Sequence, residues 1–201
     1  VEYINTIHTS WQDATNDKFN SFIKISKKIQ SEVEFIFYFD ADTSITRDFD
    51  ENWMLKGDLV GGEHFWNRYK ERNPFDRNSS SKAYIPDDGN ERMYYYGAFF
   101  GGKVYNVINF CKILISWQEH DKKVLNYEPI WNDESYINKY FNTYMHSTVS
   151  LDNFVPNISD KAGFTDNRNT SKDWDTQIYT FLKQKVSHPF SFKNREIYLY
   201  P

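Results

Sequence analysis

The sequence is poor in cysteine, in net positive charge and in long apolar runs. A single cysteine, Cys111, excludes an internal disulfide framework. The 24 basic and 28 acidic residues leave a formal net charge of -4, which provides no general attraction to nucleic acid or to an anionic membrane. No apolar run approaches the roughly 20 residues that a membrane span requires. We therefore expect neither nucleic-acid binding nor a membrane span in this chain.

Aromatic residues are abundant instead. They make up 19% of the 201 residues, with 15 Tyr and 17 Phe, which is more than one core needs for packing. We therefore expect some of them to line a binding site. The length suits one domain over residues 1–201 and is too short for two. Because the first residue is Val1 and not methionine, we expect a trimmed form or a fragment of a longer protein.

The stretch at residues 35–43 carries the clearest structural signal. Five apolar or aromatic residues lead directly into Asp40, Ala41 and Asp42. A short unbroken apolar run is typical of a strand buried on both faces of a parallel sheet, and functional groups gather at the carboxyl end of such a strand. Because side chains alternate along an extended chain, Asp40 and Asp42 are expected to point the same way.

The rest of the chain alternates helix and strand patterns. We expect helices at 17–30, 104–115 and 133–141, a strand at 94–100 closed by Gly101 and Gly102, a weaker strand at 1–8 and an amphipathic stretch at 174–182. Turn-forming residues mark 73–89 as a long irregular loop, and such loops are often functional. Strands that alternate with helices predict an α/β domain with a mainly parallel sheet flanked by helices.

Asp40 and Asp42 have two interpretations. Two aspartates spaced by one residue at a strand end supply hard oxygen ligands for a divalent ion such as magnesium or manganese. Such an ion keeps positions open for phosphate oxygens, so nucleoside diphosphate chemistry follows from this interpretation. Alternatively, the two aspartates cap a turn after the strand, since Asp is a common turn former.

A second acidic pair, Asp133 and Glu134, follows Trp131 and Asn132. The pair suits a helix start, because Asn132 is a good N-cap and first-turn acids complement the helix dipole. It also suits a sugar site, where an aromatic ring packs on C–H groups while carboxylates accept from hydroxyls. His64 follows a glycine-bearing loop and is either structural or exposed, or part of a site.

Several of these segments occur together, in order and at matching spacing, in one known family. They are Trp11 to Asp13 before the first expected helix, Asp40 to Asp42, His64, Ala83 to Pro86, Tyr95 to Gly102, Trp131 to Ser135 and Asn138 to Tyr140. Over about residues 11–157 the sequence resembles glycosyltransferase family 6. That family includes the histo-blood group A and B transferases and the α-1,3-galactosyltransferases.

The resemblance implies a fold and a reaction. The fold would be the GT-A type of nucleotide-diphospho-sugar transferases. The reaction would be the retaining transfer of galactose or N-acetylgalactosamine from UDP-galactose or UDP-N-acetylgalactosamine to the 3-hydroxyl of a β-galactoside acceptor. Manganese, or magnesium, would be the cofactor and would offset charge that builds on the departing UDP.

The resemblance also implies roles for individual residues. Glu134 would be the catalytic carboxylate, as nucleophile or as stabiliser of an oxocarbenium-like transition state, and would also touch the acceptor. The remaining assignments are Asp40 and Asp42 for the metal and donor diphosphate, Asp133, Lys18, Tyr96 and Ala98 for the donor, and His64 and Trp131 for the acceptor galactose.

The sequence departs from the family in several places. Lys18 stands where mammalian members carry an arginine, so the charge is kept and the bidentate fork is lost. Tyr96 is bulkier than the residue found there in the blood-group enzymes. The uridine-binding strand and helix that open the family's catalytic domain have no counterpart before Val1, so we expect an N-terminally incomplete domain. Lys183 and Arg195 are among the basic residues available for the tail that closes over UDP in the family.

Two other functions compete with glycosyl transfer. A catalytically silent sugar-binding module, or an inactive fragment, is suggested by the missing uridine-binding segment. A haloacid-dehalogenase-like phosphatase also places Asp40 to Asp42 after an apolar strand, but its signature wants Thr or Val where Ser44 stands. The location depends on residues upstream of Val1. An anchor there would place the enzyme in the Golgi lumen, and its absence would make it cytoplasmic.

Overall fold

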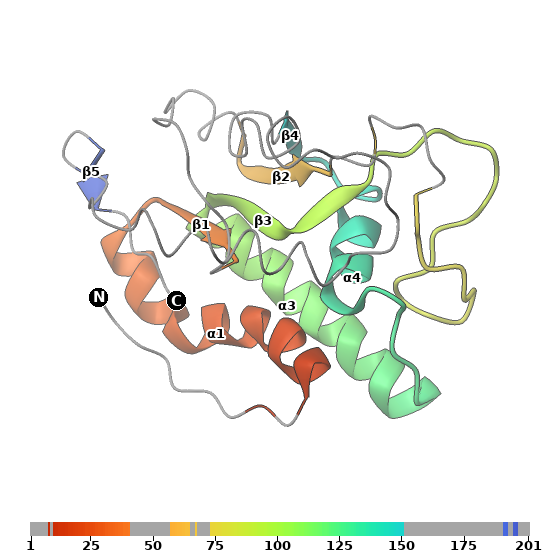
Figure 1. Cartoon of the computed structure of the whole chain (residues 1–201). Coiled ribbons are helices and arrows are strands. Elements are labelled where there is room, and N and C mark those ends of the chain that lie inside the picture. Colours follow the sequence, from red (N-terminus) through yellow and green to blue (C-terminus); the bar gives the residue numbers. More distant parts are fainter. Residues whose placement is uncertain are drawn as a thin grey trace, which may run out of the picture.

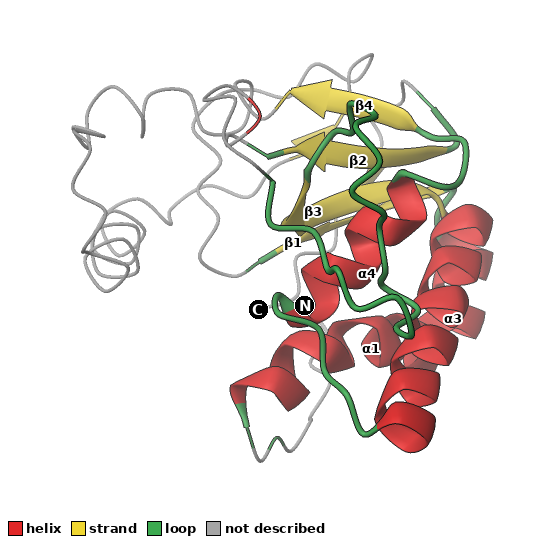
Figure 2. Cartoon of the chain, turned by 90° about the vertical axis from the view of Figure 1, so that its right-hand side faces the viewer, coloured by secondary structure: helices red, strands yellow, loops and turns green. Residues whose placement is uncertain are grey.

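The computed structural model describes residues 8, 10–40, 57–64, 67, 73–150, 191–192 and 195–196. The elements in chain order are α1 (Trp11–Glu32), β1 (Phe35–Phe39), β2 (Leu59–Glu63), β3 (Tyr95–Lys103), α3 (Val104–His120), the π-helix η2 (Asp121–Leu125), α4 (Asn132–Phe141), β4 (Ser147–Ser150), β5 (Ser191–Phe192) and β6 (Arg195–Glu196) (Figure 1). Figure 2 shows α1, α3 and α4 together on one side of the sheet that β1 to β4 form.

This sheet has the strand order β1-β3-β2-β4. β3 pairs antiparallel with both β1 and β2, and of these described pairings only that of β2 with β4 is parallel. The expectation of a mainly parallel sheet is therefore wrong for the described strands. The antiparallel pairing brings the carboxyl end of β1 beside the middle of β3, with Phe39 opposite Phe99. Asp40, which follows β1, therefore lies beside Ala98 of β3.

Among the described strands, β1 lies at the edge of the sheet, and its five residues are half-buried. The expectation of a strand buried on both faces is also wrong, because each of these residues keeps part of its surface exposed. The apolar run is unbroken because both faces carry aromatic contacts. Tyr38 stacks on Phe100, with ring centroids 5.0 Å apart, and Phe37 stacks on Phe99 at 6.2 Å. Ring packing on both faces removes the polar alternation that usually marks an edge strand.

Helix α1 begins where Ser10 accepts a hydrogen bond from the Asp13 N–H, which is an ordinary N-cap. The helix is longer than the expected 17–30, and residues 11–13 lie in its first turn rather than before it. Phe19, Phe22 and Ile29 are buried, as the helical spacing predicts.

Helix α3 confirms the expected apolar face from Val104 to Leu114 and continues to His120. Phe110 lies at the centre of the core, 5.0 Å from the Phe100 ring and 4.8 Å from the Tyr140 ring of α4. Cys111 is also buried there, and burial raises the pKa of its thiol. The core thus holds the three helices against the sheet.

Strand β3 runs through Gly101 and Gly102, so these glycines do not close it. Gly102 has a φ of 140°, and a Cβ there would meet the Asp58 carbonyl oxygen at 2.3 Å. The glycine therefore lets the segment before β2 approach β3 closely. Residues 61–63, expected in a glycine-bearing loop, belong to strand β2.

The segment at 73–94 contains no helix or strand, which confirms the irregular loop at 73–89. Polar contacts hold it in place. Arg92 binds both carboxylate oxygens of Asp88 at 2.6 and 2.7 Å, and Arg77 donates to the Ile85 carbonyl at 2.6 Å. The loop is thus a defined part of the structure.

Two expected elements, the strand at 1–8 and the amphipathic stretch at 174–182, lie outside the described residues apart from His8. Among the helices that the structure describes, none is both long enough and apolar enough to cross a membrane.

Candidate active site

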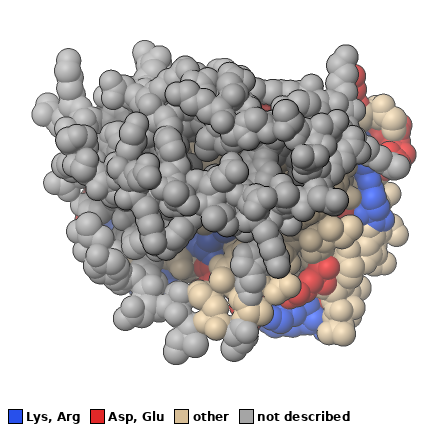
Figure 3. Space-filling model, viewed as in Figure 1, with Lys and Arg blue, Asp and Glu red and all other residues tan. Residues whose placement is uncertain are grey.

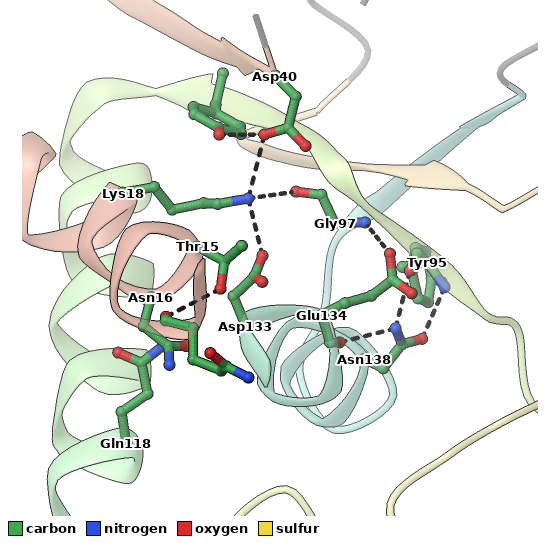
Figure 4. A network of polar contacts seen from close by, with 12 residues as sticks. Thr15, Asn16, Lys18, Asp40, Tyr95, Gly97, Gln118, Asp133, Glu134 and Asn138 are labelled. Atoms are coloured by element: carbon green, nitrogen blue, oxygen red, sulfur yellow. Dashed lines mark hydrogen bonds and ion pairs between the residues drawn. The ribbon is translucent and has the colours of Figure 1, made fainter. Parts of the chain in front are cut away.

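A pocket of about 130 Å³ lies where the carboxyl end of β1, the start of β3, α1 and the start of α4 meet (Figure 4). Its lining comprises Thr15, Lys18, Asp40, Tyr96, Gly97, Ala98, Trp131, Asp133 and Glu134. Seven of these are residues that the sequence assigned to a site. The antiparallel pairing of β1 with β3 is what brings Asp40 and the residues at 96–98 together.

Lys18 is the cation at the centre of this pocket. It projects from α1, and its Nζ lies 2.8 Å from Asp133 Oδ2, 3.3 Å from Asp40 Oδ1 and 3.2 Å from the Gly97 carbonyl oxygen. Its side chain is 8% exposed and lies over the Tyr38 ring. Burial opposes the charge, but the carboxylates of Asp133 and Asp40 outweigh it and raise the pKa of Lys18. The ammonium therefore stays protonated.

Asp40 follows β1 directly, and its backbone N–H donates to the Ala98 carbonyl at 3.1 Å. Its Oδ1 accepts from Lys18 and from the Tyr38 hydroxyl. The side chain is 37% exposed, so it remains open to a ligand. Asp42 lies outside the described residues. Of the two expected metal ligands, Asp40 and Asp42, the structure therefore describes only Asp40.

Asp133 and Glu134 lie in the first turn of α4, where acidic side chains complement the helix dipole. Asp133 is buried and Glu134 is partly buried. The helix begins at Asn132, and its N-cap is Trp131, without a side-chain capping bond. The expectation that Asn132 caps the helix is therefore wrong. Burial raises the pKa of Asp133, and the ion pair with Lys18 opposes that rise.

Glu134 is held by two donors. The Gly97 N–H donates to Oε2 at 2.6 Å, and the Tyr94 hydroxyl donates to Oε1 at 2.8 Å. Burial raises the pKa of Glu134 to about 7, although both hydrogen bonds favour the charged form. A carboxylate that changes charge near neutral pH at the wall of a pocket is typical of a catalytic group.

Gly97 is needed because α4 approaches β3 closely here. A Cβ at this position would meet Glu134 Oε2 at 3.0 Å and Asp133 Oδ2 at 3.3 Å. Any larger residue would displace one of these two carboxylates. The glycine therefore permits both the N–H contact to Glu134 and the carbonyl contact to Lys18.

Tyr94 is a site residue that the sequence did not indicate. It is fully buried, and burial and the neighbouring Glu134 raise the pKa of its hydroxyl, which therefore keeps its proton as a donor. Within the run at 94–96, nothing local distinguishes the tyrosine that faces Glu134 from the one that lines the pocket. The only signal was the density of aromatic residues.

The two residues expected to bind the acceptor, Trp131 and His64, differ in their access to the pocket. Trp131 lines the pocket with 40% of its surface exposed. His64 is 4% exposed and is not among the lining residues; its ring lies edge-on to Tyr94 and Tyr96, with centroids 5.3 and 5.2 Å away. Burial lowers the pKa of His64 to about 3, so the imidazole is neutral. Tyr96 thus stands between His64 and the pocket.

The charge of the pocket suits a cation. Its described ionisable lining consists of one ammonium, Lys18, and three carboxyl groups, Asp40, Asp133 and Glu134. Carboxylate oxygens are the ligands that divalent magnesium and manganese prefer. No group of three potential metal ligands occurs among the residues that the structure describes. Figure 3 shows Lys, Arg, Asp and Glu interspersed on the described part of one face.

Comparisons with known proteins agree on one family. The family model of glycosyltransferase family 6 matches residues 4–155. The chain is 33% identical over 147 residues to globoside alpha-1,3-N-acetylgalactosaminyltransferase 1 of Gallus gallus, which covers 71% of this chain and 41% of that protein. It is 32% identical over 136 residues to histo-blood group ABO system transferase 2 of Rattus norvegicus, covering 66% and 40%.

A bacterial protein is also similar. An O-antigen biosynthesis glycosyltransferase of Escherichia coli is 29% identical over 143 residues, which cover 70% of this chain and 60% of that protein. The chain spans about two fifths of the length of the two animal relatives that it matches. From the family match over residues 4–155, we conclude that the chain belongs to glycosyltransferase family 6.

Proposed function

We propose that the chain is the catalytic part of a retaining α-1,3-glycosyltransferase that moves galactose or N-acetylgalactosamine from its UDP donor to the 3-hydroxyl of a β-galactoside. The observation that carries this proposal is the placement of Glu134, which two donors hold at the wall of a pocket shared with Lys18 and Asp133. The names of the animal relatives, an alpha-1,3-N-acetylgalactosaminyltransferase and an ABO transferase, support the reaction class.

Glu134 is the proposed catalytic carboxylate. When the bond between the sugar and UDP breaks, positive charge develops at the sugar carbon, and a carboxylate beside it stabilises that charge or attacks the carbon. Gly97 and Tyr94 fix both oxygens of Glu134, so the group needs no reorganisation as the charge appears. A pKa of about 7 leaves a substantial ionised fraction at neutral pH.

Asp133 and Lys18 form the proposed donor site. The Asp133 carboxylate accepts from sugar hydroxyls, and the ion pair at 2.8 Å holds it in one orientation. Lys18 adds a permanent positive charge near the position of the diphosphate. Tyr96 and Ala98 line the same pocket and, through their size, select between the two donor sugars.

Asp40, together with Asp42, is proposed to hold Mn²⁺ or Mg²⁺. Asp40 fits this role because it is partly exposed at a pocket whose described lining holds three carboxyl groups and one ammonium. When bound, the metal supplies Lewis-acid stabilisation of the departing diphosphate. Lys18 already binds Asp40 Oδ1, so the ammonium orients the carboxylate.

The acceptor galactose is assigned to Trp131 and His64. The exposed Trp131 ring offers an apolar face for the C–H groups of a sugar. His64 is neutral, so it acts there as a hydrogen-bonding imidazole and not as a cation. Its edge-on contact with Tyr96 links it to the pocket lining.

The test is Glu134→Gln, assayed with Mn²⁺, lactose and either UDP-galactose or UDP-N-acetylgalactosamine. We expect transfer to fall about a thousandfold while calorimetry shows unchanged UDP binding. Glu119→Gln is the control, because Glu119 is exposed on α3 and pairs only with Lys123 among the ion pairs described. Unchanged transfer in Glu134→Gln contradicts the proposal. An unsubstituted protein without metal-dependent UDP binding supports a silent module instead.

A further inference from the structure

Side chains along one face of helix α4 bond to the backbone at the beginning of β3. Side chains four residues apart, on the helix and at its C-cap, bond to backbone groups two residues apart, on the strand and in the segment before it. Figure 4 shows the two contacts to the strand. The pairs are Glu134 with Gly97, Asn138 with Tyr95, and Asn142 with Met93.

This match has a geometric cause. Four residues of an α-helix advance about 6 Å, and two residues of a strand advance about 6.6 Å. One face of the helix therefore stays in register with one edge of the strand over two turns. β1 ends at Phe39, opposite Phe99, so it does not extend along residues 93–97. Side chains of this helix face bond to the Met93 carbonyl, to both backbone groups of Tyr95 and to the Gly97 N–H, whereas Lys18 of α1 binds the Gly97 carbonyl and Asn67 binds the backbone of Tyr94.

Asn138 makes the largest number of contacts in this arrangement. Its Oδ1 accepts from the Tyr95 N–H at 2.7 Å, and its Nδ2 donates to the Tyr95 carbonyl at 2.8 Å. The same Nδ2 donates to the Glu134 carbonyl at 2.9 Å. The residue is 1% exposed. The side-chain amide of Asn138 therefore joins the backbone of Glu134 to β3 at Tyr95, two residues before Gly97.

We propose that Asn138 is the positioning residue for Glu134. By clamping α4 to Tyr95, it sets the distance at which the Glu134 carboxylate meets the Gly97 N–H and the Tyr94 hydroxyl. The catalytic consequence rests on the proposed function of Glu134. The positioning itself does not, because it concerns only how the helix is held against the strand.

Asn142 provides a matched control. Its Nδ2 donates to the Met93 carbonyl and to the Asn138 carbonyl, both at 2.9 Å, so it makes the same kind of contact one turn further along. Asn138 is buried and Asn142 is partly exposed, so a merely structural role predicts that Asn138→Ala costs more stability but leaves the pKa of Glu134 unchanged. A positioning role predicts that Asn138→Ala alters the pKa of Glu134 and that Asn142→Ala does not.

The first measurement does not depend on transfer. NMR titration of carbon-labelled glutamate follows the pKa of Glu134, with Glu134→Gln identifying its signal. Asn138→Ala weakens the Gly97 and Tyr94 contacts that favour the ionised form, so this pKa rises by about one unit, while Asn142→Ala leaves it unchanged. Asp133 and Lys18, which also face Glu134, are unaltered in both variants. An equal pKa in all three proteins overturns the proposal.

The second measurement is the rate of transfer from UDP-galactose and UDP-N-acetylgalactosamine to lactose with Mn²⁺. Asn138→Ala is expected to lower kcat about tenfold to a hundredfold and to change the donor KM less than about twofold. In a Glu134→Gln background the same substitution has no further effect on residual transfer. A full additional loss there overturns the proposal.

Asn138→Asp covers the case in which the alanine variant does not fold. It keeps the size of the side chain and the acceptor for the Tyr95 N–H, but its carboxylate faces two carbonyl oxygens. We expect the same rise in the pKa of Glu134 and the same loss in kcat. Normal values of both in Asn138→Asp contradict the inference. If the unsubstituted protein shows no transfer, the proposed function fails, and the titration still tests the positioning.

Discussion

Two carboxylates, the fully buried Asp121 and the partly buried Glu134, show different ways of using the same chemical group. Asp121 begins η2 and is fully buried. It accepts hydrogen bonds from a hydroxyl of the loop, from a backbone N–H of the loop and from a hydroxyl of α4, and it lies 3.2 Å from a histidine ring nitrogen. These partners are Ser81 at 2.5 Å, Lys82 at 3.0 Å, Tyr136 at 3.1 Å and His120. Glu134 accepts from two donors and lines a pocket.

The carboxylates of Asp121 and Glu134 differ in whether a ligand can reach them. Donors from the 73–94 loop and α4 surround Asp121, so its charge is used to hold the loop against the helices. Glu134 is partly buried and has fewer donors, and its pKa rises to about 7. A carboxylate that has lost water contacts and has few hydrogen-bond donors can still form a new interaction with a ligand. Three substitutions test this contrast, from the largest expected change in free energy to the smallest.

Asp121→Ala is expected to reduce the free energy of unfolding by about 3 to 4 kcal/mol. The substitution leaves the Ser81 and Tyr136 hydroxyls and the Lys82 N–H without their buried acceptor. Urea denaturation followed by circular dichroism measures the loss. Asp88→Ala is the control, since Asp88 pairs with Arg92 at the surface and its removal has a much smaller effect. Equal losses in both variants contradict the structural role of Asp121.

Glu134→Gln is expected to stabilise the protein at alkaline pH. The pKa of Glu134 is about 7 in the folded state against an ordinary value of 4.5, so folding favours the protonated form. The contribution of Glu134 to stability is complete below about pH 4.5 and is lost as the pH rises through 7. The glutamine does not titrate and keeps an acceptor for the Gly97 N–H.

The stability difference between Glu134→Gln and the unsubstituted protein therefore grows from about pH 4.5 and reaches about 3 kcal/mol at pH 8. Urea denaturation at several pH values, without metal or donor, gives this difference. If the difference in unfolding free energy between the two proteins stays constant over that pH range, the prediction is wrong. The donors to Glu134 would then compensate its burial as fully as those around Asp121.

Tyr94→Phe removes one of the two donors to Glu134 and keeps the ring. The pKa of Glu134 should rise by about one unit, because the lost hydrogen bond favours the ionised form. The acidic limb of the pH profile of kcat/KM moves up by the same amount. Tyr127→Phe is the control, because it removes an equivalent bond, 2.7 Å long, to Asp76 outside the pocket. A shift of equal size in both variants contradicts the assignment.

Much of the site was predictable because its chemistry is local in the sequence. Asp40 follows an apolar run directly, and Asp133 and Glu134 adjoin Trp131, so motif and resemblance both indicate them. The structure places Asp40, Trp131, Asp133 and Glu134 around one pocket. Helices α3 and α4 were predictable as well, since their apolar residues recur at helical spacing.

Other features depend on contacts between distant segments. Tyr94 reaches Glu134 across 40 residues of sequence, and Asn138 reaches Tyr95 across 43. The burial of His64 behind Tyr96 depends on how β2 pairs with β3. The antiparallel pairings of β3 were missed for the same reason, because an apolar run does not specify the direction of its neighbour.

The sequence by itself determined the family, the identity of the acidic residues and the helices that carry Lys18 and Glu134. These follow from local spacing and from a contiguous set of motifs. Only the tertiary structure decided which charges face one another. The antiparallel approach of β1 to β3 and the close packing of α4 at Gly97 place one ammonium among three carboxyl groups, and burial there then sets the pKa of Glu134. Desolvation depends on the surrounding fold, so no local pattern encodes it.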